Sequence, residues 1–184
     1  MYSNGQLVYG RNYVLNSSGI NATDTVRPTL IGNMSLVSAD ASVSYTSESI
    51  VIKSKGQSSP YGWFYQIATN GTIPTNNSIV PGQNYTFSVK VRGTVSQVAL
   101  RWGSTLGVNN TGMKFYNISN NWTKISATFA ISNGAKDIFL RILGAVNNQY
   151  LTGFTGNEAF EFKEVKVEYG NVATGRTPAP EDYI

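Results

Sequence analysis

The stretch QNYTFSVKVRG, residues 83–93, indicates the fold class more clearly than any other part of the chain. Apolar and polar side chains alternate strictly along it. The apolar ones are Tyr85, Phe87, Val89 and Val91, and those between them are Thr86, Ser88, Lys90 and Arg92. A period of two is that of a β-strand with one buried and one outward face. The stretch therefore predicts a strand in a sheet that covers an apolar core.

Segments of the same kind follow at short intervals, separated by clusters of Gly, Asn and Pro. They cover residues 13–15, 43–53, 61–67, 97–102, 113–118, 122–131, 137–143 and 159–169. The last segment changes phase between Phe162 and Val165, which predicts a β-bulge. Together they favour an all-β fold, a two-sheet antiparallel β-sandwich of jelly-roll type with about eight strands.

A chain of 184 residues fits one domain, and no internal repeat or boundary interrupts the strand pattern. We expect a lead-in at residues 1–12, the jelly-roll module at 13–170, and a linker at 171–184. Pro178 and Pro180 stop strand pairing and stiffen that linker, which suits a connection to another domain.

The composition excludes several classes of function. The chain has neither histidine nor cysteine, so it cannot contain a Ser-His-Asp or Cys-His catalytic arrangement, a disulfide or a thiolate metal site. Its net charge of +4 comes without a Lys/Arg run, which argues against binding of nucleic acid. No apolar run approaches the roughly 18 residues that a membrane span needs, so we expect no membrane insertion.

The acidic residues give little support to catalysis. Glu158, Glu161, Glu164 and Glu168 alternate with Lys163 and Lys166 along one segment, the pattern of a solvated strand face. Asp24, Asp40, Glu48 and Asp137 lie among turns, where carboxylates bond local backbone. We therefore expect no enzyme activity and no cofactor. A structural calcium ion between the N-terminal segment and the last strand is compatible with the sequence, although no ligands can be named.

The outward side chains offer a binding face. If the jelly roll places the strands of the main cations in one sheet, four positive charges meet on its outer face, with polar and aromatic residues among them. The expected site consists of Lys53, Lys90, Arg101, Arg141, Ser88, Gln97 and Phe139, with Trp63, Tyr61 and Tyr65 reaching in from a neighbouring loop or strand. Aromatic rings accept the C–H faces of sugars, and guanidinium groups select hydroxyls or anions.

The alternative is that the aromatic residues belong to the core and the cations only protect sheet edges. For Trp102 and Trp122 we favour this alternative. For Trp63 and Arg141 both interpretations stay open.

Three parts of the chain resemble the jelly-roll carbohydrate-binding modules of secreted glycanases and of tail proteins from phages that infect Gram-positive bacteria. GRNYVLNSSG (residues 10–19) resembles the opening of the phage modules. PGQNYTFSVKVRG and NWTKISATFAI resemble their paired central strands. FEFKEVKVEYGNVATGRTPAPED (residues 160–182) is similar to their closing strand and exit.

The resemblance implies a noncatalytic module of a distal tail or baseplate protein that recognises host cell-wall polysaccharide. The module would act in the virion tail, outside the host cell, joined to other domains of a larger tail protein. The concave sheet would hold the glycan, with Phe139 and Arg141 as an aromatic and a polar contact and Trp63 as a loop aromatic. Glycanase modules often carry a carboxylate at the Arg141 position, so a cation there points to an anionic wall glycan.

Two other functions are compatible with the sequence. The domain could be a structural decoration or spacer of a tail protein, which an unbroken apolar outward patch would favour. A glycan depolymerase would need two carboxylates facing each other across a cleft.

Overall fold

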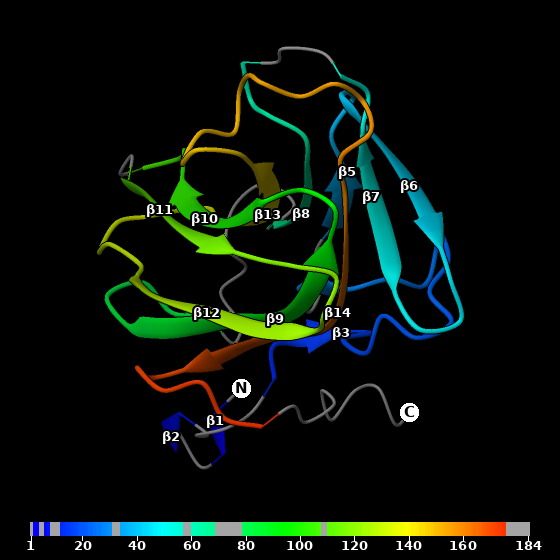
Figure 1. The fold of residues 1–184 in the computed structure, drawn as a ribbon. Helices are drawn as coiled ribbons and strands as arrows, with labels where there is room; N and C mark the ends of the chain where they lie inside the picture. Colours follow the sequence, from blue (N-terminus) through cyan, green and yellow to red (C-terminus); the bar gives the residue numbers. More distant parts are fainter. Residues whose placement is uncertain are drawn as a thin grey trace.

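The computed structural model describes residues 2–3, 6–7, 12–30, 34–56, 60–68, 79–107 and 110–175. The described residues contain no helix. They therefore include no helix that is long and apolar enough to cross a membrane. Ten of the strands form two five-stranded antiparallel sheets, and four shorter ones form two-stranded pairs (Figure 1). The short pairs join β1 (Tyr2–Ser3) to β2 (Gln6–Leu7) and β3 (Val14–Leu15) to β4 (Thr29–Leu30).

The first sheet, called sheet I here, has the strand order β11-β10-β13-β8-β5. Its strands are β11 (Asn110–Asn117), β10 (Gln97–Ser104), β13 (Phe139–Ala145), β8 (Phe64–Ala68) and β5 (Met34–Val37). β13 is therefore the central strand, with β10 and β8 on its two sides.

The second sheet, sheet II, has the order β12-β9-β14-β7-β6. Its strands are β12 (Thr123–Ala130), β9 (Asn84–Gly93), β14 (Ala159–Tyr169), β7 (Ile50–Ser54) and β6 (Ala41–Tyr45). The chain crosses between the sheets repeatedly: β8, β10, β11 and β13 belong to sheet I, whereas β9, β12 and β14 belong to sheet II. The two sheets face each other across the core.

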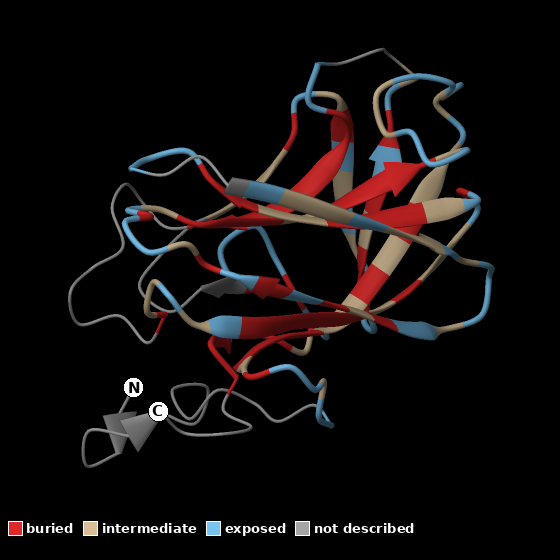
Figure 2. Cartoon of the chain, turned by 90° about the vertical axis from the view of Figure 1, so that its left-hand side faces the viewer, coloured by how far each residue is buried: buried red, intermediate tan, exposed pale blue. Residues whose placement is uncertain are grey.

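The core follows from the alternation that opens the sequence. Tyr85, Phe87, Val89 and Val91 are at most 1% exposed and point toward sheet I. Inward residues of sheet I, among them Val98, Leu100 and Ile142, meet them and are equally buried. Buried segments accordingly line the space between the two layers (Figure 2).

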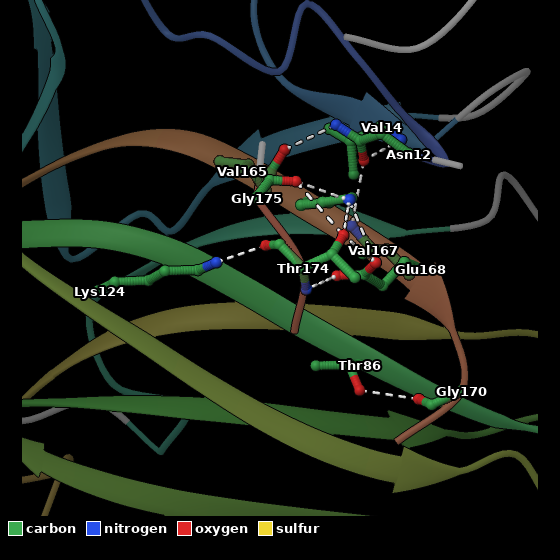
Figure 3. A network of polar contacts seen from close by, with 11 residues as sticks. Asn12, Val14, Thr86, Lys124, Val165, Val167, Glu168, Gly170, Thr174 and Gly175 are labelled. Carbon is green, nitrogen blue, oxygen red and sulfur yellow. Dashed lines mark hydrogen bonds and ion pairs between the residues drawn. The ribbon is translucent and has the colours of Figure 1, made fainter. Parts of the chain in front are cut away.

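The predicted bulge is present in β14. Its register with β9 shifts between Lys163 and Lys166, and Glu164 adopts a positive φ of 53°. β7 pairs only with the part of β14 before the bulge. The N-terminal segment, residues 12–18, lies beside the part after it. There the Tyr13 N–H donates to the Val167 carbonyl at 2.9 Å. The side-chain amide of Asn12 donates to the Val165 carbonyl and accepts from the Val167 N–H (Figure 3).

The chain after β14 lies against the outer face of sheet II. We call residues 170–175 the C-terminal segment. Thr174 bonds both carboxylate oxygens of Glu168, at 2.8 Å from its N–H and 2.7 Å from its hydroxyl (Figure 3). The ammonium group of Lys166 donates to Thr174 and Gly175 and forms a 3.1 Å ion pair with Glu168. Both charged side chains are only 1% exposed, so this segment is packed onto the sheet through a buried ion pair.

The all-β, two-sheet prediction is confirmed, and two element predictions differ in detail. Residues 43–53 form a hairpin of two strands, β6 and β7. β5 lies outside the segments predicted as strands. The first residues of the predicted 171–184 linker are packed on sheet II, and residues 176–184 lie outside the described part.

Candidate functional site

The outer face of sheet I brings together the polar and aromatic groups most suited to binding. Strand register places five side chains side by side across its middle: Met113, Arg101, Arg141, Gln66 and Leu36. We call this set the central row. One row further along lie Phe115, Ala99, Leu143 and Phe64, of which the last three are buried. The face therefore has two arginines at its centre on an apolar floor.

Arg141 is held in place from three sides. Its guanidinium carbon lies 4.2 Å from the ring centroid of Phe64 and 4.7 Å from that of Phe139. Its Nε–H donates to Oε1 of Gln66 at 2.6 Å. Partial burial, and then the positive charge of Arg101, lower the pKa of Arg141 to about 10. The group is still charged at neutral pH, fixed between two aromatic rings.

Arg101 is the direct cross-strand partner of Arg141. It donates from Nη1 to the Tyr150 hydroxyl at 3.3 Å, and its guanidinium lies 5.7 Å from the Phe139 ring centroid. Tyr150 reaches this position from the loop after β13, where it lies against Gly62. A side chain at residue 62 would come within 2.6 Å of the Tyr150 carbonyl oxygen, so the close approach requires glycine.

Amides form a second polar group at one end of the face. Gln97 Nε2 donates to Asn117 at 2.9 Å and to Asn148 at 3.1 Å, and the backbone N–H of Asn148 donates to Gln97 at 2.7 Å. Tyr61, which is 62% exposed, lies close enough to Arg141 to affect its ionisation. The face thus combines an exposed ring, fixed amides and two cations.

Five of the ten predicted site residues lie on or beside this face: Arg101, Arg141, Phe139, Gln97 and Tyr61. Three others do not, because the strands that carry them belong to the opposite layer. Lys53 is on β7, and Ser88 and Lys90 are on β9. All three point away from sheet I, so the expected cluster of four cations is divided between two opposite faces. The prediction that one sheet carries all of them is wrong.

Trp63 and Tyr65 do not reach this face either, and of the two interpretations left open for Trp63 the core one is correct. Each is 1% exposed and belongs to the core. Trp63 packs against Phe160 and over Gly144, where an added Cβ would lie 1.8 Å from the indole ring. The hydroxyl of Tyr65 donates to the Pro28 carbonyl at 2.6 Å, and burial raises its pKa. Trp63 is therefore not a loop aromatic over a binding cleft.

Gln66 and Phe64 were not predicted to lie at the site, because the prediction with Tyr61, Trp63 and Tyr65 outward has the wrong phase for this strand. A shift of one residue sends every side chain to the other face. The available signal was Gln66 itself, since it is the one polar residue of β8 and a lone polar side chain favours the outward face.

The two other tryptophans lie in different surroundings. Trp102 stacks on Phe129 with ring centroids 5.9 Å apart, as the core interpretation predicted. The core interpretation is wrong for Trp122, which is half-buried on the outer side of sheet II, where Arg92 and Lys163 lie 4.5 and 4.3 Å from its ring centroid. A neighbouring hollow of about 300 Å³ is lined in part by Arg92 and Glu161, which form a 2.9 Å ion pair.

The carboxylates of the described residues serve local structure. Asp137 accepts hydrogen bonds from Ser104, Thr105 and Leu106; against the opposing effect of burial, these bonds hold its pKa below the ordinary value. No three acidic, histidine or cysteine side chains gather into a metal site in this part of the chain. Between β14 and the C-terminal segment, the Lys166 ammonium contacts oxygens of Glu168, Thr174 and Gly175.

Comparison with known proteins connects this fold to carbohydrate binding. Residues 66–147 match the model of a carbohydrate-binding domain family. No curated protein matches the chain in sequence. A solved CBM4 structure has a TM-score of 0.52 and 14% identity over 71% of this chain and 78% of its own. A xylan-binding domain from CBM 22 has a TM-score of 0.54 and 15% identity, covering 90% of this chain and 97% of its own.

A phage protein has a similar fold. The enzymatically active domain of tailspike protein 4 from bacteriophage CBA120 has a TM-score of 0.50 and 13% identity over 86% of this chain. This chain spans 21% of that domain's length. The structural similarities establish the fold, which is the sandwich of the carbohydrate-binding modules, and residues 66–147 carry the sequence match to that family.

Proposed function

We propose that this chain is a noncatalytic carbohydrate-binding module that holds saccharide on the outer face of sheet I. The observation that carries the proposal is the composition of that face: the two arginines between aromatic rings, the amides of Gln97 and Asn117 at one end, and the exposed Tyr61, which is close enough to affect the ionisation of Arg141. Rings stack on sugar C–H faces, and fixed amide and guanidinium donors bind hydroxyls.

The range matched by the family model covers strands of both sheets, including most of sheet I. The matched range includes Gln66, Gln97, Arg101, Phe139 and Arg141, the polar and aromatic residues at the centre and one end of sheet I's outer face. Neither row described above contains a carboxylate, whereas glycoside hydrolysis uses a pair of them. This composition favours binding without bond cleavage.

We further propose that the saccharide is cell-wall polysaccharide of a Gram-positive host, and that the module belongs to a distal tail or baseplate protein of a phage, outside the cell. The resemblance of the opening and closing stretches to phage modules supports this setting, and so does the similarity to a phage tailspike domain. A single copy should bind weakly, and several copies on a tail would offset this weakness through multivalency.

Sedimentation with purified Gram-positive cell walls tests the proposal. The protein should sediment with intact walls and stay in solution with walls stripped of polysaccharide. Tyr61→Ala should weaken binding about tenfold, because it removes an exposed ring while leaving the core intact. Val172→Ala is the matched control, since Val172 is 73% exposed on the C-terminal segment over sheet II.

Equal binding by Tyr61→Ala and the unaltered protein would contradict the assignment of this face. Absence of binding to walls by the unaltered protein would favour the structural role of a spacer domain. Release of reducing sugar from the walls would instead indicate a depolymerase.

A further inference from the structure

The arginine pair at the centre of sheet I is energetically unfavourable as it stands. Arg101 and Arg141 are direct cross-strand partners on β10 and β13, and like charges in that arrangement destabilise a sheet. Both residues are half-buried, so water screens their repulsion less than it would on an open surface. The lowered pKa of Arg141 reflects the same burial and repulsion.

No carboxylate of the described residues forms an ion pair with either arginine. The sequence has ten acidic residues, and only Glu181 and Asp182 lie outside the described ranges. The other layer differs sharply, because Lys90, Arg92 and Lys166 on sheet II each pair with a glutamate at 2.9–3.1 Å. Three outward cations of sheet II are therefore paired with carboxylates, whereas neither arginine of sheet I is paired with one by the described residues.

Both guanidinium groups have N–H donors that the described residues do not use. Each has five N–H groups, and among the described residues each uses one: Arg141 bonds Gln66, and Arg101 bonds Tyr150. The rings of Phe64 and Phe139 fix the plane of the Arg141 group at 4.2 and 4.7 Å. Fixed, parallel N–H donors of this kind match the geometry of carboxylate and phosphate oxygens.

We infer that Arg101 and Arg141 together form an anion-binding subsite, which takes the carboxylate or phosphate group of an acidic saccharide. This inference rests on the proposed function, since the anion would be part of the glycan held on the same face. Binding of one anion between the two groups would relieve their repulsion and satisfy donors that the described residues leave open.

Affinity electrophoresis with three polysaccharides tests the subsite. Polygalacturonate supplies carboxylates, and poly(glycerol phosphate) supplies phosphates. Fully methyl-esterified polygalacturonate is the neutral control for polygalacturonate. We expect the protein to prefer one or both anionic polymers to the neutral one, and the two anionic arms distinguish carboxylate from phosphate. Arg101→Gln and Arg141→Gln should each weaken anionic binding about tenfold or more, as for the loss of a hydrogen bond to a charged group.

The controls separate this subsite from general charge. Lys53→Gln removes one positive charge from the opposite face, where Lys53 is exposed, and should change none of the affinities. Arg141→Lys keeps the charge but loses the planar fork, so it should recover only part of the anionic binding.

Three results would overturn the inference. The first is equal binding of the neutral and anionic polymers by the unaltered protein. The second is a loss of affinity for the anionic polymers in Lys53→Gln as large as the loss in the arginine variants. The third is unchanged anionic binding in both arginine variants. If the protein binds saccharide through Tyr61 without regard to its charge, the subsite fails and the proposed function stands. If it binds neither walls nor any of the three polymers, both fail.

Discussion

At the scale of single residues, Trp63 gives the clearest test of whether an aromatic residue belongs to the core or to a saccharide site. Its indole is 1% exposed and packs against Phe154 and Phe160. We expect Trp63→Ala to lower the free energy of unfolding by about 3–5 kcal/mol, as for other buried aromatic residues truncated to alanine. Urea unfolding measures this loss. Tyr61→Ala is the control and should stay within about 0.5 kcal/mol of the unaltered protein.

A Trp63→Ala protein of unchanged stability that had lost saccharide binding would contradict the core assignment. That result would instead place Trp63 in the saccharide-binding site.

The predictability of individual residues depended on the strength of the local alternation. Phe139 and Arg141 were correctly placed outward, because Ile138, Leu140 and Ile142 define the inward phase without ambiguity. Around Trp63 every residue from 62 to 68 is buried, so alternation carries little information there. Strands buried on both sides read as continuous apolar runs, and their phase is set by tertiary packing.

At the scale of elements, the clearest feature is the attachment of the C-terminal segment to β14. Lys166 and Glu168 lie two residues apart on one side of the strand, and the backbone and hydroxyl of Thr174 complete their hydrogen bonds. The segment therefore lies on the sheet at a position that a buried charge pair defines.

We expect Lys166→Met to destabilise the protein by about 3–5 kcal/mol, because it leaves the Glu168 carboxylate buried without its counter-charge. Thermal and urea unfolding measure the effect. The double variant Lys166→Met/Glu168→Leu should recover most of the loss, since replacing both members of a buried pair by apolar residues is often neutral. A double variant as unstable as the single one would contradict this explanation.

Elements with regular alternation could be predicted, and those without it could not. β9, β10, β12, β13 and the bulged β14 all lie close to their predicted ranges. β5 was missed because it is four residues long and its sequence MSLV is too short to show a period. The layer to which each strand belongs depends on pairing between distant segments, such as β7 with β14, and local sequence does not encode it.

At the scale of the whole molecule, the two outer faces differ in what covers them and in how their charges are paired. The outer face of sheet II is engaged by the C-terminal segment and carries paired charges, and the N-terminal segment from residue 12 runs beside β14 in the same layer (Figures 1 and 3). The outer face of sheet I lies on the opposite side, with its two arginines uncompensated by the described residues. This division is the physical basis for placing the saccharide on sheet I.

The most direct test of that placement is a map of backbone amide NMR shifts as soluble polysaccharide released from Gram-positive walls is added. We predict that the largest changes fall on β10, β13 and β8, around Arg101, Arg141 and Gln66, while β7, β9 and β14 change little. The largest changes on the outer face of sheet II, around Trp122 and Arg92, would contradict the account.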